Sequence, residues 1–106
     1  MSRILLVVVL IAQLGFISTG KPYTATAYSL RGHTAYGIYV RRGIVAADTR
    51  IHPLGSKIKV NAGRYSGIYL VADTGKKIRG TRIDIWMGSR KEAMKFGKRK
   101  VHVIKL

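Results

Sequence analysis

The chain contains no cysteine, which excludes disulfide bonds, thiolate metal sites and a cysteine nucleophile. Proline is also scarce, with 2 residues in 106, while 47% of the residues are hydrophobic. This composition favours a folded globular chain over a disordered one. A length of 106 residues leaves room for one small domain.

Acidic residues are nearly as scarce. Against 20 lysines and arginines there are 4 acids, Asp48, Asp73, Asp84 and Glu92, so the net charge is +16. Such a field attracts polyanions. It fits either a general affinity for anionic surfaces such as a cell wall, or nucleic-acid binding. The basic residues are spread along the chain without a nucleic-acid-binding motif, which favours the first interpretation.

The first 20 residues have the pattern of an export signal. Arg3 precedes an apolar run over residues 4–17, and small residues follow up to Gly20. The run is short for a bilayer span, which needs about 20 apolar residues. We therefore predict a signal peptide at 1–20, cut after Gly20, and an exported domain at 21–106. An uncleaved N-terminal anchor is the alternative.

The remainder alternates short apolar runs with glycine-bearing turns, which predicts an all-β fold with one short helix. Residues 30–42 are expected to form a loop. Six short strands separated by turns favour a small closed or nearly closed β-barrel. The expected strands are residues 23–29, 43–47, 57–60, 68–72, 82–86 and 101–106.

The helix is predicted between Ser89 and Gly97. Ser89 followed three residues later by Glu92 is a capping box, in which the Ser89 hydroxyl accepts from the Glu92 amide. Gly97 fits the end of the helix. This gives Glu92 a structural role and leaves three aspartates for chemistry.

Asp48, Asp73 and Asp84 each stand in or at the end of an apolar run. Carboxylates on neighbouring strands can converge on one face of a barrel, where mutual proximity raises the pKa of one of them. Asp84, between Ile83 and Ile85, is the best candidate for a carboxyl kept protonated by desolvation, and thus for a general acid. The alternative for each aspartate is a structural strand end or turn cap.

A second pattern at Asp73 predicts different chemistry. Asp73-Thr74-Gly75 after an apolar run fits the aspartic protease signature, and a chain this short would have to dimerise to pair two such aspartates. Lys76 counts against it, because a small residue is expected there. A protease of that kind also has no use for Asp48 or Asp84.

Histidines and aromatic residues give weaker signals. His33, His52 and His102 lack metal-ligand spacing, so we predict no metal site. Aromatic rings in a small barrel belong either to the core or to a platform that stacks on sugars. The candidates for a platform are Tyr28, Tyr36, Tyr39 and Trp86.

Several ordered motifs together resemble a known family, the three-aspartate (3D) domain, over about residues 23–106. The matching segments are ATAYS at 25–29, VAAD at 45–48, IHPLGSK at 51–57, VADTG at 71–75, IRGTRIDI at 78–85, EAMKFGKR at 92–99 and VHV at 101–103. The family is named for the aspartates that Asp48, Asp73 and Asp84 match.

The resemblance implies a double-psi β-barrel, related to membrane-bound lytic transglycosylase A and to stationary-phase survival proteins that cleave peptidoglycan. It implies that Asp84 is the catalytic acid/base, that Asp73 assists, and that Asp48 completes the catalytic set. The implied reaction cleaves the MurNAc–GlcNAc β-1,4 bond without water and leaves a 1,6-anhydro-MurNAc end. It needs no cofactor and no nucleophilic carboxylate, unlike the two-carboxylate glycosidases.

Substrate binding is assigned to residues beside these aspartates. Lys76 and Lys77 depart from the family pattern and make the loop more cationic, which favours anionic wall polymer as a further partner of a protein that binds peptidoglycan strands. The alternative function is a non-catalytic wall-binding module with the same barrel, and a third class is a secreted nucleic-acid binder. The assigned substrate-binding residues are Thr26, Tyr28, Thr74, Gly75, Lys77 and Arg79.

Overall fold

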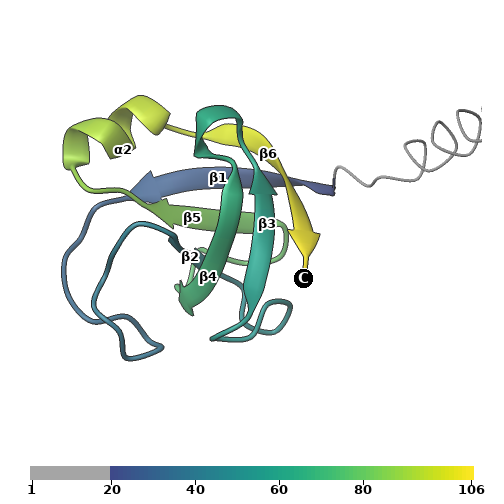
Figure 1. Ribbon diagram of the computed structural model, residues 1–106, viewed down its shortest axis with the longest axis horizontal. Helices are drawn as coiled ribbons and strands as arrows, with labels where there is room; N and C mark the ends of the chain where they lie inside the picture. Colours follow the sequence, from purple (N-terminus) through teal and green to yellow (C-terminus); the bar gives the residue numbers. More distant parts are fainter. Residues whose placement is uncertain (1–19) are drawn as a thin grey trace, which may run out of the picture.

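Six strands close into a barrel in the computed structural model, which describes residues 20–106 (Figure 1). Around the barrel their order is β1-β5-β2-β4-β3-β6. The strands are β1 (Lys21–Tyr28), β2 (Ile44–Ala47), β3 (Lys57–Asn61), β4 (Gly67–Asp73), β5 (Arg82–Trp86) and β6 (Arg99–Lys105).

Strand directions are mixed. The pairs β1–β5 and β2–β4 are parallel, and the other four neighbouring pairs are antiparallel. Within residues 20–106 the expected six-stranded double-psi barrel with one short α-helix is therefore confirmed, and the predicted strands agree with the observed ones within about two residues. The predicted signal peptide or anchor lies outside the described residues, apart from Gly20.

Helix α2 (Arg90–Phe96) packs beside the end of β1 at one end of the barrel (Figure 1). Its cap forms as predicted, because the Glu92 amide donates to the Ser89 hydroxyl at 3.1 Å. The Glu92 carboxylate also accepts from Arg42 and from the Tyr65 hydroxyl, which ties the helix to the loop before β2 and to the 3-10 turn η1 (Gly63–Tyr65). Among residues 20–106, no helix combines the length and apolarity that crossing a membrane requires.

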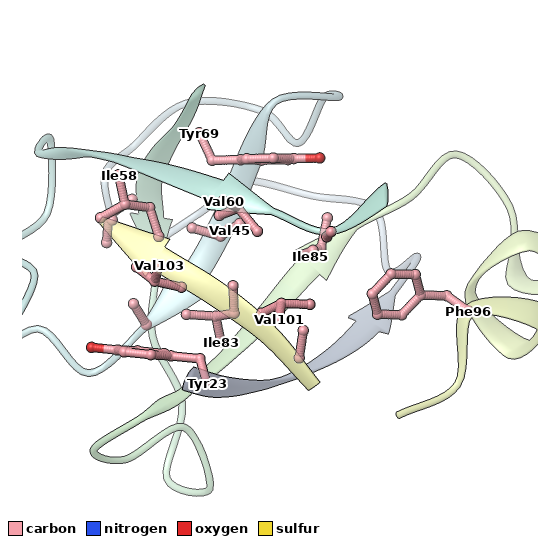
Figure 2. Close-up of a cluster of buried hydrophobic side chains, with 14 of the residues drawn as sticks. Tyr23, Val45, Ile58, Val60, Tyr69, Ile83, Ile85, Phe96, Val101 and Val103 are labelled. Atoms are coloured by element: carbon pink, nitrogen blue, oxygen red, sulfur yellow. The ribbon is translucent and has the colours of Figure 1, made fainter. Parts of the chain in front are cut away.

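The core fills the barrel interior with alternate side chains of every strand (Figure 2). On β5, Ile83 and Ile85 are 0% and 1% exposed, so the intervening Asp84 is directed to the outer face. The labelled side chains in Figure 2, among them Tyr23, Val60 and Val103, converge from several strands on the same space.

A second, smaller cluster lies on the outer face. Ile44, Ala72 and Trp86 are buried there against partly buried residues that include Ile38 and Val40 of the β1–β2 loop. The loop is fixed in place because the Trp86 indole N–H donates to the Leu30 carbonyl oxygen at 2.9 Å. Trp86 is thus a packing residue that attaches the loop to the barrel wall.

The difference in burial predicts that truncating two isoleucines will lower the free energy of unfolding by very different amounts. Ile83→Ala removes buried methyl groups from the barrel interior and should lower the free energy of unfolding by about 2–5 kcal/mol in chemical denaturation. Ile68→Ala makes the same truncation on β4, where the side chain is 62% exposed, and should change it by no more than about 0.5 kcal/mol. Equal losses in the two variants would contradict this assignment of the core.

Candidate functional site

Asp84 sits at the centre of β5 and is flanked by two neighbouring strands. Its register partners are Thr26 on the parallel strand β1 and Ala46 on the antiparallel strand β2. Because register partners share a face, all three side chains lie on the outside of the barrel wall.

A β-bulge brings Asp73 onto the same face. Val45 pairs with Val71, and the register then shifts, so that Ala46 pairs with Asp73. In a regular ladder Ala46 would pair with Ala72, and Asp73 would point to the opposite face. Four strands thus contribute one lateral row, Thr26–Asp84–Ala46–Asp73. Two strand spacings separate Asp84 from Asp73, or about 10 Å between backbones, and the small Ala46 lies between them.

Burial and neighbouring groups act on the pKa of Asp84. Desolvation of the half-buried carboxyl raises its pKa above the ordinary value, and the nearby charge of Asp73 adds to the rise. The hydrogen bond from Thr26 Oγ1 to Asp84 Oδ1, at 3.0 Å, and the charge of Arg82 oppose it without cancelling it. The sequence-based prediction of a raised pKa from desolvation at Asp84 is confirmed.

Asp73 is held by two backbone amides. Its Oδ1 accepts from the Thr74 N–H at 3.0 Å and from the Ala35 N–H at 3.2 Å. These bonds orient the carboxylate and connect it to the β1–β2 loop, where the Tyr36 N–H also donates to the Ala72 carbonyl at 2.9 Å. The contribution of Ala35 left no signal in the sequence, because any residue other than proline supplies the same amide.

Tyr28 lies two residues beyond Thr26 on the same face of β1. Burial raises the pKa of its phenol, and the charges of Asp73 and Asp84 raise it further, so the hydroxyl remains protonated. That hydroxyl is buried and has no hydrogen-bond partner within residues 20–106. It is therefore an available donor in the neighbourhood of both carboxylates.

Asp48 has a different environment. Its carboxylate is 1% exposed and accepts from the Arg50 guanidinium at 2.8 and 3.0 Å and from the Gly80 amide at 2.9 Å. These bonds, led by that from Arg50, hold the pKa of Asp48 far below its ordinary value. The structure thus brings Asp73 and Asp84 together and uses Asp48 to fasten the turn after β2 to the 74–81 loop.

The 74–81 loop starts at Asp73 and carries the other predicted contacts. Buried Ile78, whose amide donates to the Gly75 carbonyl at 3.0 Å, anchors the loop. Thr74, Lys77 and Arg79 are exposed. With Lys76, which is also exposed, the loop therefore presents three cations to solvent just after Asp73.

A hollow of ≈ 630 Å³ extends from this row toward the helix. Its lining includes Thr26 and Tyr28 of β1. It also includes Leu30, Met94 and Lys98. Leu30 and Met94 are 78% and 69% exposed, so the hollow has an apolar rim. Thr26, which lines this hollow, hydrogen-bonds Asp84, so the hollow adjoins the row.

The remaining histidine and aromatic candidates do not belong to the row, although Trp86 pairs with Tyr28 on the same face. His52 is buried and bonds the Tyr23 hydroxyl at 2.8 Å, and His33 packs edge-on against Tyr39. Of the proposed stacking aromatics, Tyr36 and Tyr39 are about half exposed, whereas Trp86 is buried. Within residues 20–106, no group of three or more histidines or acids is arranged to hold a metal ion.

Comparison with known proteins gives one matching family model and several relatives. The model of the 3D domain matches residues 43–106. Three relatives come from Bacillus subtilis: a putative cell wall shaping protein, YabE, at 33% identity over 81% of this chain; a cell wall-binding protein, YocH, at 35% over 80%; and an SPbeta prophage-derived uncharacterized protein, YorM, at 38% over 91%. The chain spans 23%, 30% and 40% of these relatives' lengths.

The opposite pKa shifts of two aspartates predict opposite effects on stability. Asp84 has a raised pKa, so its stabilising contribution is present at low pH and is lost as pH rises through the folded-state pKa. Asp84→Asn should therefore raise the melting temperature relative to the native chain at pH 7, and this gain should shrink toward pH 3.

Asp48→Asn is the matched comparison. The pKa of Asp48 is lowered in the folded state. Its contribution to stability is therefore present at pH values above the ordinary carboxyl pKa, and it is lost as the pH falls toward the folded-state pKa. The variant should melt below the native chain at pH 7, by less as the pH is lowered. Thermal unfolding of both variants across this range checks the signs. Parallel pH trends for the two would refute the assignment.

Proposed function

Because the chain belongs to the 3D domain family, we propose that it is a peptidoglycan lytic transglycosylase that cleaves the MurNAc–GlcNAc β-1,4 bond. The observation that carries this proposal is the row Thr26–Asp84–Ala46–Asp73, in which a half-buried carboxyl with a raised pKa faces a second carboxylate across a small residue.

Asp84 acts as the acid and then as the base. Its carboxyl donates a proton to the glycosidic oxygen as the bond from C1 of MurNAc to that oxygen breaks, which releases GlcNAc with a free 4-hydroxyl. The 6-hydroxyl of the same MurNAc attacks C1, and its proton passes to the Asp84 carboxylate. No water is consumed, and the enzyme returns to its starting protonation state.

Asp73 and Tyr28 support this acid. The negative charge of Asp73 raises the pKa of Asp84 and stabilises positive charge that develops at C1. The Tyr28 hydroxyl, buried and unpaired among the described residues, donates to a sugar oxygen at the row. The amide contacts of Asp73 keep its carboxylate oriented.

Substrate binding follows from the surroundings of the row. The hollow from Thr26 to α2 holds the glycan chain, and Lys77 and Arg79 attract acidic groups of the wall polymer. In keeping with the relatives named for cell-wall shaping and binding, the protein is exported and acts at the cell wall.

A second candidate function is supported by a specific relative. YocH is named a cell wall-binding protein, and it shares 35% identity over 80% of this chain. In that case the same barrel binds peptidoglycan without cleaving it. The enzyme needs Asp84 to form the anhydro product, whereas the binding module uses Asp84 only to contact peptidoglycan.

Asp84→Asn should separate them. The variant keeps an acceptor for Thr26 but has no proton to donate, so release of anhydro-muropeptides from purified peptidoglycan should fall by about 10²–10⁴-fold, as measured by mass spectrometry. Co-sedimentation with the wall should be retained. A native chain that sediments with the wall but releases no anhydro product would leave only the binding function.

Thr26→Val tests how the acid is tuned. The Thr26 hydrogen bond lowers the pKa of Asp84, so its loss should move the basic limb of the kcat/KM profile to higher pH. Thr24→Val, on the same strand and face, should leave the limb unchanged. A limb that does not move in Thr26→Val, or moves to lower pH, would disprove the role of this contact.

A further inference from the structure

Two adjoining hollows, of ≈ 350 and ≈ 400 Å³, lie between η1 and helix α2. They share Arg64, Tyr65 and Glu92, so they adjoin, and we call the two together the basic trough. None of its residues belongs to the row at Asp84. Its cations are Arg42, Arg64, Lys91, Lys95 and Arg99.

The trough has a large excess of positive charge. Its one carboxylate, Glu92, is engaged by Arg42 at 2.6 Å and by the Tyr65 hydroxyl at 3.1 Å. Among residues 20–106 the ion pairs are Arg42–Glu92 and Arg50–Asp48. The other four cations of the trough therefore have no carboxylate partner in the described part of the chain, and they remain available to an anionic ligand.

Two of these cations are held in place by aromatic rings. The Arg99 guanidinium lies 4.3 Å from the Phe96 ring centroid and donates from Nε to the Phe96 carbonyl at 2.9 Å. Arg64 lies 5.4 Å from the Tyr65 ring centroid. Positioned guanidinium groups bind phosphate with less loss of side-chain entropy than free ones, because their planar fork is already oriented.

We propose that the basic trough binds a linear phosphodiester polymer, of the polyol-phosphate kind found in bacterial cell walls. Four unpaired cations spread over two adjoining hollows match repeated phosphates better than a single ion. The site is separate from the Asp84 row, so it holds whether or not the chain cleaves glycan.

Charge alone does not distinguish this ligand from nucleic acid, but the aromatic residues do. Binding of single-stranded nucleic acid relies on open aromatic faces on which bases stack. Tyr65, the aromatic residue that both hollows share, packs edge-on against Phe96 at 5.3 Å and has Arg64 and Arg99 near its ring. The other aromatic residues that line it, Tyr69 and Trp86, are 9% and 6% exposed, so the trough offers cations without an open ring face for bases.

The test measures binding of the full chain to poly(glycerol phosphate) at several salt concentrations. The double variant Lys91→Gln, Lys95→Gln should raise Kd by about tenfold or more and reduce the slope of log K against log salt by about 1–2. The matched control is Lys57→Gln, Lys59→Gln, which removes the same charge from exposed positions of β3 outside the trough. It should change Kd by less than about twofold.

Three results would overturn the proposal. Equal weakening in both double variants would mean that diffuse charge, and not the trough, binds the polymer. No measurable binding of the native chain would exclude the ligand. Tighter binding of DNA with the same number of phosphates, lost through the same two lysines, would identify a nucleic-acid site. Release of anhydro-muropeptides from wall stripped of phosphate polymers is a separate readout, so failure here is distinguishable from failure of the proposed enzyme.

Discussion

The β-bulge between β2 and β4 determines which carboxylates share a face of this barrel. By moving the partner of Ala46 from Ala72 to Asp73, it turns Asp73 to the outer wall, where alternation along β5 has already placed Asp84. Without the extra residue the row would contain one acid, and Asp73 would be directed to the opposite face of the sheet. The β1–β2 loop then fixes this arrangement, because its amides bind the Asp73 carboxylate and the Ala72 carbonyl.

The few acids of this chain lie in two kinds of electrostatic environment. Asp48 and Glu92 each engage an arginine and are kept ionised, and both serve to join segments of the fold. Asp84 has no ion-pair partner among residues 20–106, and burial raises its pKa despite the hydrogen bond from Thr26. The many cations that have no acid to pair with remain on the surface, and those of the basic trough are gathered beside the helix. The same shortage of acids accompanies a raised pKa at Asp84 on one face and unpaired cations beside the helix on another.

Much of the fold could be predicted from the sequence because its signals are local. Strand alternation, glycine turns and the Ser89 cap each involve residues a few positions apart, and desolvation of Asp84 follows from the isoleucines on either side of it. The site depended on pairings that sequence does not display. The bulge depends on the pairing of β2 with β4. The hydrogen bond from the Gly80 amide to Asp48 joins residues that are 32 positions apart in the sequence. Grouping Asp48 with the other two aspartates therefore missed its separate environment.

The most direct test of the account is the pKa of Asp84 itself, measured by carboxyl NMR titration in the native chain and in Asp73→Asn. The account predicts a native value above about 3.9, the ordinary value for an aspartate, and a decrease when the charge of Asp73 is removed. A native value at or below the ordinary one, or no response to Asp73→Asn, would contradict the claim that burial and the charge of Asp73 raise the pKa of Asp84.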